Sequence, residues 1–338
     1  MKFSIIIPVR SINNYLKENI KHLKELDYED FEVIILIDTD EHYDFADQRF
    51  KVIHIAGNKG PGEKRNIGAA EATGAILAFL DDDAYPTKNW LTVSAAIFKQ
   101  EPYIYALGAP AVTPPNASLK EKIGGMVLAS RLTGGGTVYR HVPLKPIKIK
   151  DYPTVNLFVK KAAFDAVDGF STEFWPGEDT KLCLDLVKSF GEDFIYDPRP
   201  IVYHHRREIF RPHLKQVSRY GTHRGQFARI YPETSRIPSY FVPSLFVLGL
   251  ILGPIAALFY PFLWDFYISV LLVYIVLVFL ESAKISIKEP KPLVFFYAAV
   301  GIVLTHLVYG VSFINGFVRR PVLKLREIDS KTGNYIGG

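Results

Sequence analysis

Cysteine is almost absent from this sequence, because Cys183 is the only one in 338 residues. A single cysteine excludes an intrachain disulfide and a metal site built from several thiolates. We expect Cys183 to be a small buried apolar residue. The start of the chain has only a short apolar run, from Phe3 to Val9, and that run contains Pro8. It is too short for the hydrophobic part of a signal peptide, so we expect none there.

Acidic residues are outnumbered by basic ones, and the formal net charge is +5 at pH 7. This excess fits an anionic partner such as a membrane surface, a nucleotide or a diphosphate. We expect no nucleic-acid partner. Hydrophobic residues make up 49% of the chain, and the mean hydropathy of +0.10 is high for a purely soluble protein. Because the excess is confined to the last third, the sequence predicts a soluble domain followed by membrane segments.

The central feature of the sequence is the stretch of residues 58–86. It predicts a basic loop punctuated by glycine and proline, then a short helix, then a buried strand over residues 75–80. Three carboxylates, Asp81, Asp82 and Asp83, follow that strand directly. Carboxylates this close repel one another unless a cation neutralises them. Oxygen ligands at a strand end suit a hard divalent ion, and we predict Mg²⁺ or Mn²⁺.

A second interpretation treats the three aspartates as solvated turn residues that cap a helix beginning near Thr87. The preceding loop favours the ion site, because Lys64 and Arg65 are expected near the same edge of the sheet as the acids. In open α/β sheets that edge is where ligands bind.

Buried strands alternate with amphipathic helices along the chain. The runs Lys2–Val9 and Phe31–Ile37 are continuously apolar, as in a parallel sheet covered on both faces. A helix over Asn13–Leu26, with Asn13 as its N-cap, lies between them. Further strands are expected at Lys51–Ala56, Tyr103–Val112, Tyr152–Lys160 and Pro200–His205, and helices at Thr87–Gln100, Ser118–Leu132, Lys161–Val167 and Glu178–Phe190. This alternation predicts an α/β fold with a doubly wound, mostly parallel sheet.

The motif in the central stretch resembles that of the family 2 glycosyltransferases. Its members here are Asn58, Gly60, Arg65, Asn66 and Gly68, then Asp81 and Asp83 after the strand. Such enzymes are inverting, have the Rossmann-like GT-A fold and use nucleotide-sugars. The resemblance runs from Met1 to about Tyr220, and the chain is most similar to the membrane-anchored type of succinoglycan biosynthesis.

The resemblance implies a donor site at the sheet edge. The residues that it assigns to nucleotide-sugar binding are Pro8, Asp38, Asp40, Gly60, Lys64, Arg65, Asn66, Asp81 and Asp82. It assigns the divalent cation, Mn²⁺ or Mg²⁺, to Asp83 with help from Asp81. In the family an acid after the second strand contacts the base or ribose. The usual D-D-G-S is Asp38-Thr39-Asp40 in this chain, so the choice between the two acids stays open.

A catalytic base is implied at Gly177-Glu178-Asp179, since family members carry G-E-D at this position. The resemblance assigns the base that deprotonates the acceptor hydroxyl to Asp179, with Glu178 supporting it. A base needs only hydrogen-bond reach of the acceptor oxygen and ionisation near neutral pH. The alternative is structural, because acids in the first turn of a helix complement its dipole.

The resemblance also implies residues that bind the acceptor or the diphosphate, namely Asn156, His205, Gln216, Arg219 and Tyr220. His204 and His205 are expected to point to opposite faces of a strand. Each remains a candidate ligand of the metal or diphosphate, or a packed surface residue. Gln216 and Arg219 share a helix face, and the planar Arg side chain suits a diphosphate. Tyr220 replaces the tryptophan of the family's Q-x-x-R-W, which weakens the case for processive polymer synthesis.

The apolar residues of the last third fall into three stretches. We expect a glycosyltransferase domain at 1–225, a basic interfacial linker at 226–239, transmembrane helices at 240–260, 262–281 and 293–318, and a basic tail at 319–338. Each stretch is near the ~20 residues that cross a bilayer, and the first two are expected to form a hairpin. His306 lies within the third, where an interhelical hydrogen bond is the favoured role.

The basic residues give conflicting evidence on orientation. Arg229 and Arg236 before the hairpin, and Lys284, Lys288 and Lys291 after it, place both of its ends and the preceding domain in the cytoplasm. A third full span then puts the bases of the tail outside. Either the rule fails at the tail or the third segment does not cross. We expect three spans.

These features together predict a membrane-bound inverting glycosyltransferase of the plasma membrane, with its catalytic domain in the cytoplasm. The expected donor is a nucleotide-sugar, a UDP-sugar before a GDP-sugar. The expected acceptor is a lipid-linked saccharide on a polyprenyl phosphate or diphosphate, for cell-surface polysaccharide or glycoconjugate synthesis. The alternatives are a polyprenyl-phosphate monosaccharide synthase, a nucleotidyltransferase, and a non-catalytic membrane scaffold with a degenerate domain.

Overall fold

The structure, a computed structural model, describes residues 1–319 apart from 42 and 58. These residues form two compact units. The sheet unit comprises Met1–Val112 and Val142–His204, and the helical unit comprises Thr113–His141 and the chain from His205 onward. This division by contacts falls at other positions than the expected boundary at residue 225. Asn58 of the motif, and the bases of the tail beyond Arg319, lie outside the described residues.

The sheet unit is built on one large sheet. Its strands are β1 (Phe3–Pro8), β2 (Phe31–Ile37), β3 (Phe50–His54), β4 (Ile76–Leu80), β6 (Ala106–Gly108), β8 (Ile147–Ile149), β9 (Asn156–Lys160) and β10 (Phe194–Tyr196). Within the described residues the strand order is β3-β2-β1-β4-β9-β6-β10-β8. The first four strands are parallel to one another, and β9 is antiparallel to both of its neighbours. The expected α/β fold is confirmed.

Helices cover this sheet, and several of them begin at the edge where β1, β2 and β4 end. They are α1 (Asn14–Lys24), α2 (Pro61–Ala70), α3 (Trp90–Gln100), α6 (Lys161–Asp165) and α7 (Glu178–Phe190). Asn13 caps α1 as expected, since its Oδ1 accepts a hydrogen bond from the Leu16 N–H at 2.8 Å. A Cβ on Gly68 of α2 would lie 2.7 Å from Ile6 Cγ2, so this motif glycine permits close packing of α2 on β1. Cys183 of α7 is fully buried, as expected.

A smaller sheet brings a distant strand beside the three aspartates. Its strands are β5 (Ala84–Pro86), β7 (Ala111–Val112) and β11 (Val202–His204). β11 pairs antiparallel with β5, and the register sets His204 opposite Ala84, the residue directly after Asp83. The end of β11 therefore adds an imidazole next to the carboxylates that follow β4.

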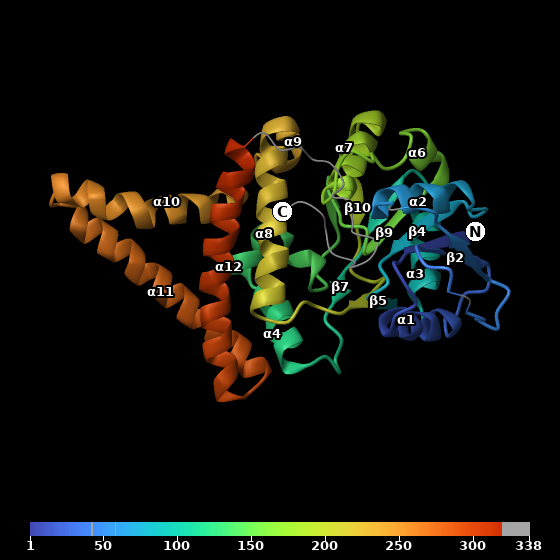
Figure 1. The fold of residues 1–338 in the computed structure, drawn as a ribbon, viewed down its shortest axis with the longest axis horizontal. Helices are drawn as coiled ribbons and strands as arrows, with labels where there is room; N and C mark the ends of the chain where they lie inside the picture. Colours follow the sequence, from blue (N-terminus) through green and yellow to red (C-terminus); the bar gives the residue numbers. More distant parts are fainter. Residues whose placement is uncertain (42, 58, 320–338) are drawn as a thin grey trace. The chain divides into compact units, whose positions relative to one another are not determined.

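The helical unit contains the last third of the described chain. Its helices are α4 (Leu119–Leu128), α5 (Arg131–Gly134), a 3₁₀ helix (Gly135–Arg140), α8 (Arg211–Ile230), α9 (Pro232–Ser235), α10 (Pro238–Phe259), α11 (Leu263–Lys288) and α12 (Pro292–Val318). Within this unit α12 lies alongside α8, while α10 and α11 form a hairpin that extends away from α12 (Figure 1). Among the described residues, α10, α11 and α12 are the helices long and apolar enough to cross a membrane. They correspond to the three expected apolar stretches.

Some expected elements are divided in the structure. The strand expected at Tyr103–Val112 is two strands, β6 and β7, in different sheets, and Pro110 between them has no N–H to donate to a ladder. The helix expected at Ser118–Leu132 ends at Leu128 and restarts at Arg131, because the Ser130 side chain accepts the Leu132 N–H and caps a new helix. The three-residue strands β5, β8 and β10 were not predicted.

Candidate active site

The charged side chains of the central stretch meet at the carboxyl ends of β1, β2 and β4. Asp38 follows β2, and Asp81 follows β4. α2 begins at the same edge, because the helix leads into β4 and so runs against it. Lys64 and Arg65 lie in the first turns of α2 and are both buried. The expected convergence of acids and bases on this edge is confirmed within the sheet unit.

Arg65 joins two carboxylates from different elements. Its Nη2 lies 2.7 Å from Asp81 Oδ1, and its Nη1 lies 3.1 Å from Glu178 Oε1. The Arg65 side chain is only 4% exposed, so both ion pairs are largely shielded from water. Gly62 permits this approach, since a Cβ there would lie 3.3 Å from Glu178 Cβ. Arg65 thus couples the end of β4 to the start of α7.

Lys64 holds the end of β2 against the end of β1. Its Nζ lies 2.6 Å from Asp38 Oδ2 and donates to the Val9 carbonyl at 2.8 Å. Burial lowers the pKa of Lys64, and the nearby Asp38 carboxylate opposes that shift. In the described part of the chain, Asp38 Oδ1 and Thr39 Oγ1 are buried without a hydrogen-bond partner. Buried polar atoms without partners are uncommon in folded proteins, so this edge has polar atoms available for a ligand.

Asp81, Asp83 and His204 form a group with the spacing of a metal site. Each offers one ligand atom, and these atoms all lie within 4.8 Å of one another. His204 Nε2 lies 3.2 Å from Asp83 Oδ1. Two carboxylates suit Mg²⁺ or Mn²⁺, and the imidazole shifts the preference towards a first-row transition ion such as Mn²⁺. The donor set therefore fits the divalent cation that the sequence predicts.

The sequence analysis left both histidines open as ligands of the metal or the diphosphate. The prediction chose His205 for the acceptor or diphosphate, but His204 is the residue beside Asp83. His205 belongs to the helical unit, where its Nδ1 lies 3.4 Å from Glu121 Oε1. Successive residues of a strand point to opposite faces, and the pairing of β11 with β5 decides which face meets the acids. The role of His205 in acceptor binding stays a prediction.

Asp82 is held by the start of α1. Its Oδ2 accepts a hydrogen bond from Asn13 Nδ2 at 2.6 Å, while Asn19 Nδ2 donates to the Asp81 carbonyl at 3.3 Å. Burial and the neighbouring Asp83 raise the pKa of Asp82 to about 6. Asn13 and Asn19 were not among the predicted site residues, because capping and packing account for an asparagine in a helix equally well. A direct contact of Asp82 with the nucleotide-sugar stays a prediction.

The start of α7 presents two acids in different environments. Glu178 is buried, and its Oε2 accepts the Gly177 N–H at 3.1 Å. Burial raises the pKa of Glu178, while Arg65 acts in the opposite direction. Asp179 is half-buried, and its Oδ1 accepts the Thr180 N–H at 2.7 Å. Gly177 has a φ of 123°, a conformation that glycine adopts readily, and so it allows the turn into this helix.

Asn156 lies in the interior of the sheet unit. The sequence analysis placed it with the acceptor or diphosphate, but its side chain is completely buried. Its Oδ1 accepts the Trp90 indole N–H at 2.9 Å, and its Nδ2 donates to the carbonyls of Pro110 and Pro200. With its amide used in this way, Asn156 ties the two sheets together, and its role towards the acceptor or diphosphate stays a prediction.

Other predicted donor residues lie at or near the edge in structural roles. Asn66 makes two hydrogen bonds of 2.8 Å with the backbone of Phe170, and these order the segment before α7. Gly60 is the N-cap of α2 and Pro8 ends β1. Asp40 is exposed. Contacts of these four residues with a nucleotide-sugar stay predictions.

Three predicted acceptor residues belong to the other unit. Gln216, Arg219 and Tyr220 lie on α8, and Gln216 Nε2 donates to the Tyr220 hydroxyl at 3.0 Å. Arg219 and Tyr220 are exposed. Their roles towards the acceptor or diphosphate stay predictions.

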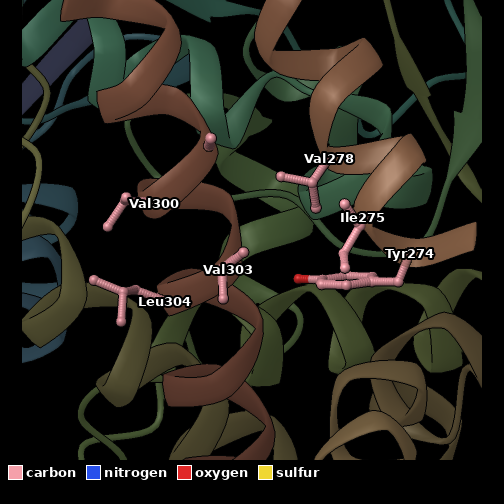
Figure 2. Close-up of a pocket in the computed structure, with 7 residues that line it drawn as sticks. Tyr274, Ile275, Val278, Val300, Val303 and Leu304 are labelled. Carbon is pink, nitrogen blue, oxygen red and sulfur yellow. The ribbon is translucent and has the colours of Figure 1, made fainter. Parts of the chain in front are cut away.

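The helical unit has a groove of a different character. It lies between α11 and α12 and has a volume of about 340 Å³. Its lining is Tyr274, Ile275, Val278, Ala299, Val300, Val303 and Leu304. Figure 2 shows the labelled side chains on the two helices, with the hydroxyl of Tyr274 as their polar group. A groove lined in this way suits hydrocarbon and lacks the groups that bind a nucleotide.

Comparisons with known proteins identify a family for the first half of the chain. Residues 4–166 match the model of the family described as Glycosyl transferase family 2. The pre-mycofactocin glycosyltransferase of Mycobacterium tuberculosis is 28% identical over 237 residues, which are 68% of this chain and 48% of that protein. The chain thus spans about half the length of this relative. The glucosyl-dolichyl phosphate glucuronosyltransferase of Haloferax volcanii is 28% identical over 225 residues, covering 60% of this chain and 69% of that protein.

A solved structure shares the fold over most of the chain. It is a mannosyltransferase from Pyrobaculum calidifontis in complex with GDP-Man and Mn²⁺, with a TM-score of 0.55 at 15% sequence identity. The match covers 95% of this chain and 88% of that one. The solved structure shows the fold, and the family match leads to one conclusion: residues 4–166 of this chain form a domain of glycosyl transferase family 2.

Proposed function

We propose that this protein is a metal-dependent, inverting glycosyltransferase that transfers a sugar from a nucleoside diphosphate donor to a lipid-linked acceptor. The observation that carries the proposal is the network at the sheet edge. Asp81 belongs to the group that fits a divalent ion. Arg65 joins Asp81 to Glu178, which directly precedes Asp179 on α7. This network fixes the start of α7, where Asp179 lies, relative to the carboxylates that follow β4.

The donor side is supported by the polar atoms at the end of β2. Asp38 Oδ1 and Thr39 Oγ1 have no partner among the described residues, and an acid and a hydroxyl are suited to the base or ribose of a nucleotide. Lys64 fixes the other oxygen of Asp38 at 2.6 Å, so the carboxylate is held in one orientation. We propose Asp38, ahead of the exposed Asp40, as the contact to the nucleoside.

The chemistry follows from the positions of the acids. Asp81, Asp83 and His204 would hold the cation, which neutralises the negative charge on the departing diphosphate. Asp179 takes the proton of the acceptor hydroxyl as that oxygen bonds to the anomeric carbon and the bond to the diphosphate breaks. Attack from the side opposite the leaving group inverts the anomeric configuration. Glu178, neutralised by Arg65, holds the start of α7 in place.

The acceptor and location are supported by the helical unit. Three helices of the described chain have the length and composition to cross a membrane, and the relative from Haloferax volcanii is named for a glucosyl-dolichyl phosphate substrate. A nucleotidyltransferase has no need of such helices. We propose a lipid-linked saccharide acceptor and action at the cytoplasmic leaflet of the plasma membrane.

Nucleotide binding tests this proposal directly. Melting temperatures of the detergent-solubilised protein are measured with UDP, GDP, CDP and dTDP, each with and without Mn²⁺. A ligand that binds only the folded state raises the melting temperature. We expect one nucleotide to stabilise the protein only with Mn²⁺, and Asp83→Ala to abolish the effect. Asp165→Asn, which removes a carboxylate from an exposed position on α6, is the matched control and should respond like the original chain.

The nucleotide-binding experiment gives different results for an enzyme and for a non-catalytic scaffold. No stabilisation by any nucleotide supports the non-catalytic scaffold and contradicts the proposed enzyme. His204→Gln compared with His205→Gln then tests the metal group, because only the former removes a side chain beside Asp83. We expect weaker Mn²⁺ dependence in the His204 variant alone.

A further inference from the structure

α12 packs along α8 through polar and very close contacts. His213 Nε2 lies 2.9 Å from Thr305 Oγ1, and Ser218 Oγ lies 2.9 Å from Ser312 Oγ. A Cβ on Gly316 would lie 2.1 Å from the Thr222 carbonyl oxygen, so the two backbones nearly touch. In these contacts the residue number rises along α8 as it rises along α12. The second half of α12 therefore lies parallel to α8 and directly on it.

α8 is not a helix that enters hydrocarbon. Its Lys and Arg residues are Arg211, Lys215, Arg219, Arg224 and Arg229, and all of them except Arg224 are exposed. Charged side chains at the centre of a bilayer are among the costliest residues to insert. Basic helices of this kind lie at the membrane surface, where they meet anionic headgroups. Because the second half of α12 lies along α8, it is held at the membrane surface together with α8.

The first half of α12 is covered in the same manner. Ile123 and Val127 of α4, with Ile209, form one buried cluster with Ala298 and Ile302 of α12. α4 starts with charged residues, and Lys122 Nζ lies 3.0 Å from Glu289 Oε1 just before α12. The whole of α12 thus has one face against elements that carry charge.

α10 and α11 differ from α12 in this respect. In their most apolar stretches, only 17% and 6% of the residues are buried, compared with 39% in α12. Figure 1 shows both helices extending away from α12 and meeting at their shared turn. α10 has 22 residues, about 33 Å of helix at 1.5 Å per residue, which matches the ~30 Å of a hydrocarbon core. The hairpin has the length and the all-round apolar surface of a membrane crossing.

We propose that, within the described residues, only α10 and α11 cross the membrane, and that α12 lies along the membrane surface with α8. The proposal rests on the membrane association proposed above. Two crossings return the chain to its starting side, so Arg319 after α12 lies on the same side as the residues before α10. This places α12 as a surface helix and replaces the expected three spans.

The charges support an even number of crossings. Arg236 precedes the hairpin, Lys284 and Lys288 end it, and Arg319 follows α12. With two crossings all of these bases lie on one side, as the positive-inside rule requires. The turn at 260–262 has no base and begins with Tyr260, and Trp264 follows it, as is typical of the interface at the far side. The conflict that three spans produce is removed.

Labelling of single cysteines tests the topology. Cys183 is buried and is replaced by alanine, and three variants each place one cysteine at an exposed position, as Pro261→Cys, Lys288→Cys or Arg319→Cys. Intact cells and permeabilised cells are treated with a membrane-impermeant maleimide. We expect Pro261→Cys to be labelled in intact cells, and Lys288→Cys and Arg319→Cys only after permeabilisation. Metal-dependent nucleotide binding in each variant confirms that it is folded.

The other outcomes separate the proposals. Labelling of Arg319→Cys but not Lys288→Cys in intact cells means that α12 crosses and overturns the inference. Absence of labelling at Pro261→Cys in intact cells, with labelling after permeabilisation, means that the hairpin does not cross and overturns it as well. Release of the chain from membranes by alkaline carbonate contradicts membrane insertion itself. Absence of metal-dependent nucleotide binding in the original chain, together with the expected labelling, contradicts the enzyme proposal and leaves the topology standing.

Discussion

The sheet edge and the interface between α8 and α12 both bury polar groups, but they bury different kinds. At the sheet edge the groups are ionic, with Arg65 between the carboxylates of Asp81 and Glu178. At the helix interface they are neutral, as in the Ser218–Ser312 hydrogen bond. Buried ion pairs are costly to form and respond strongly to any added charge, whereas neutral hydrogen bonds hold elements together at modest cost. The first arrangement suits a charged ligand, and the second suits a fixed contact between helices.

Asp179→Asn is expected to have the largest effect, because it removes the proposed base and leaves the buried ion pairs intact. Loss of a general base lowers the rate by roughly 10²- to 10⁴-fold. Transfer to an acceptor hydroxyl should fall by this factor, while Mn²⁺-dependent nucleotide binding should be unchanged. The rates are measured with a lipid-linked saccharide. A variant with full activity would remove Asp179 as the base.

The same variant separates the two lipid acceptors. A polyprenyl phosphate is already ionised and has no hydroxyl proton to remove, so its glycosylation does not need the base. If Asp179→Asn retains transfer to a polyprenyl phosphate, and the original chain uses that acceptor better than a lipid-linked saccharide, the monosaccharide synthase becomes the favoured function.

Arg65→Met tests the buried ion pairs at the sheet edge. It leaves Glu178 buried without its partner, and breaking a buried ion pair in this way costs about 3 to 5 kcal/mol of folding free energy. Chemical denaturation in detergent measures the loss. Adding Glu178→Gln should recover part of it, because the uncompensated charge is then gone. If the double variant is no more stable than Arg65→Met, the unpaired charge of Glu178 is not the cause of the lost stability.

The interface between α8 and α12 can be tested by measuring how stability depends on pH, because it contains His213. Burial lowers the pKa of His213 from 6.5 to about 4, so the unfolded chain binds more protons between these values. The contribution of the neutral His213 side chain to folding stability is therefore complete above pH 6.5 and is lost as the pH falls towards 4. The loss is about 3 kcal/mol, because one pKa unit corresponds to 1.36 kcal/mol. His213→Gln should remove this part of the pH dependence. Equal pH profiles for the variant and the original chain would contradict the assignment.

Ser218→Ala is expected to have the smallest effect. It removes one neutral hydrogen bond, to Ser312, which is worth about 1 kcal/mol. The melting temperature in detergent should fall slightly, and a Ser218→Ala/Ser312→Ala double variant should lose little more, since both partners are then absent. A loss as large as that of Arg65→Met would erase the distinction between the two regions.

Local sequence patterns predicted the helices and strands whose bounds depend mainly on residues close by in the sequence. β2 has the predicted bounds of Phe31–Ile37, and α7 runs from Glu178 to Phe190 as expected. Asn13 is the predicted N-cap of α1. Continuous apolar runs, caps and chain breakers act within a few residues, so the sequence alone carries their signal.

Pairs formed between distant segments could not be predicted in the same way. The sequence offered His204 and His205 equally, and the pairing of β11 with β5 selected His204. Asn156 resembled a ligand residue, but three partners from other segments use its amide in the interior.

The sequence by itself determined the chemical components of this protein. It specified three acids after a buried strand, two bases before it, acids at the start of α7, and three apolar segments near its end. The tertiary structure decided which of these components meet: Arg65 with both Asp81 and Glu178, and His204 with Asp83. It also set α12 against α8. The physical reason is that local propensity acts over a few residues, whereas strand register and helix packing join groups that are 92 or more residues apart in the Arg65–Glu178 ion pair and in the hydrogen bonds between side chains of α8 and α12.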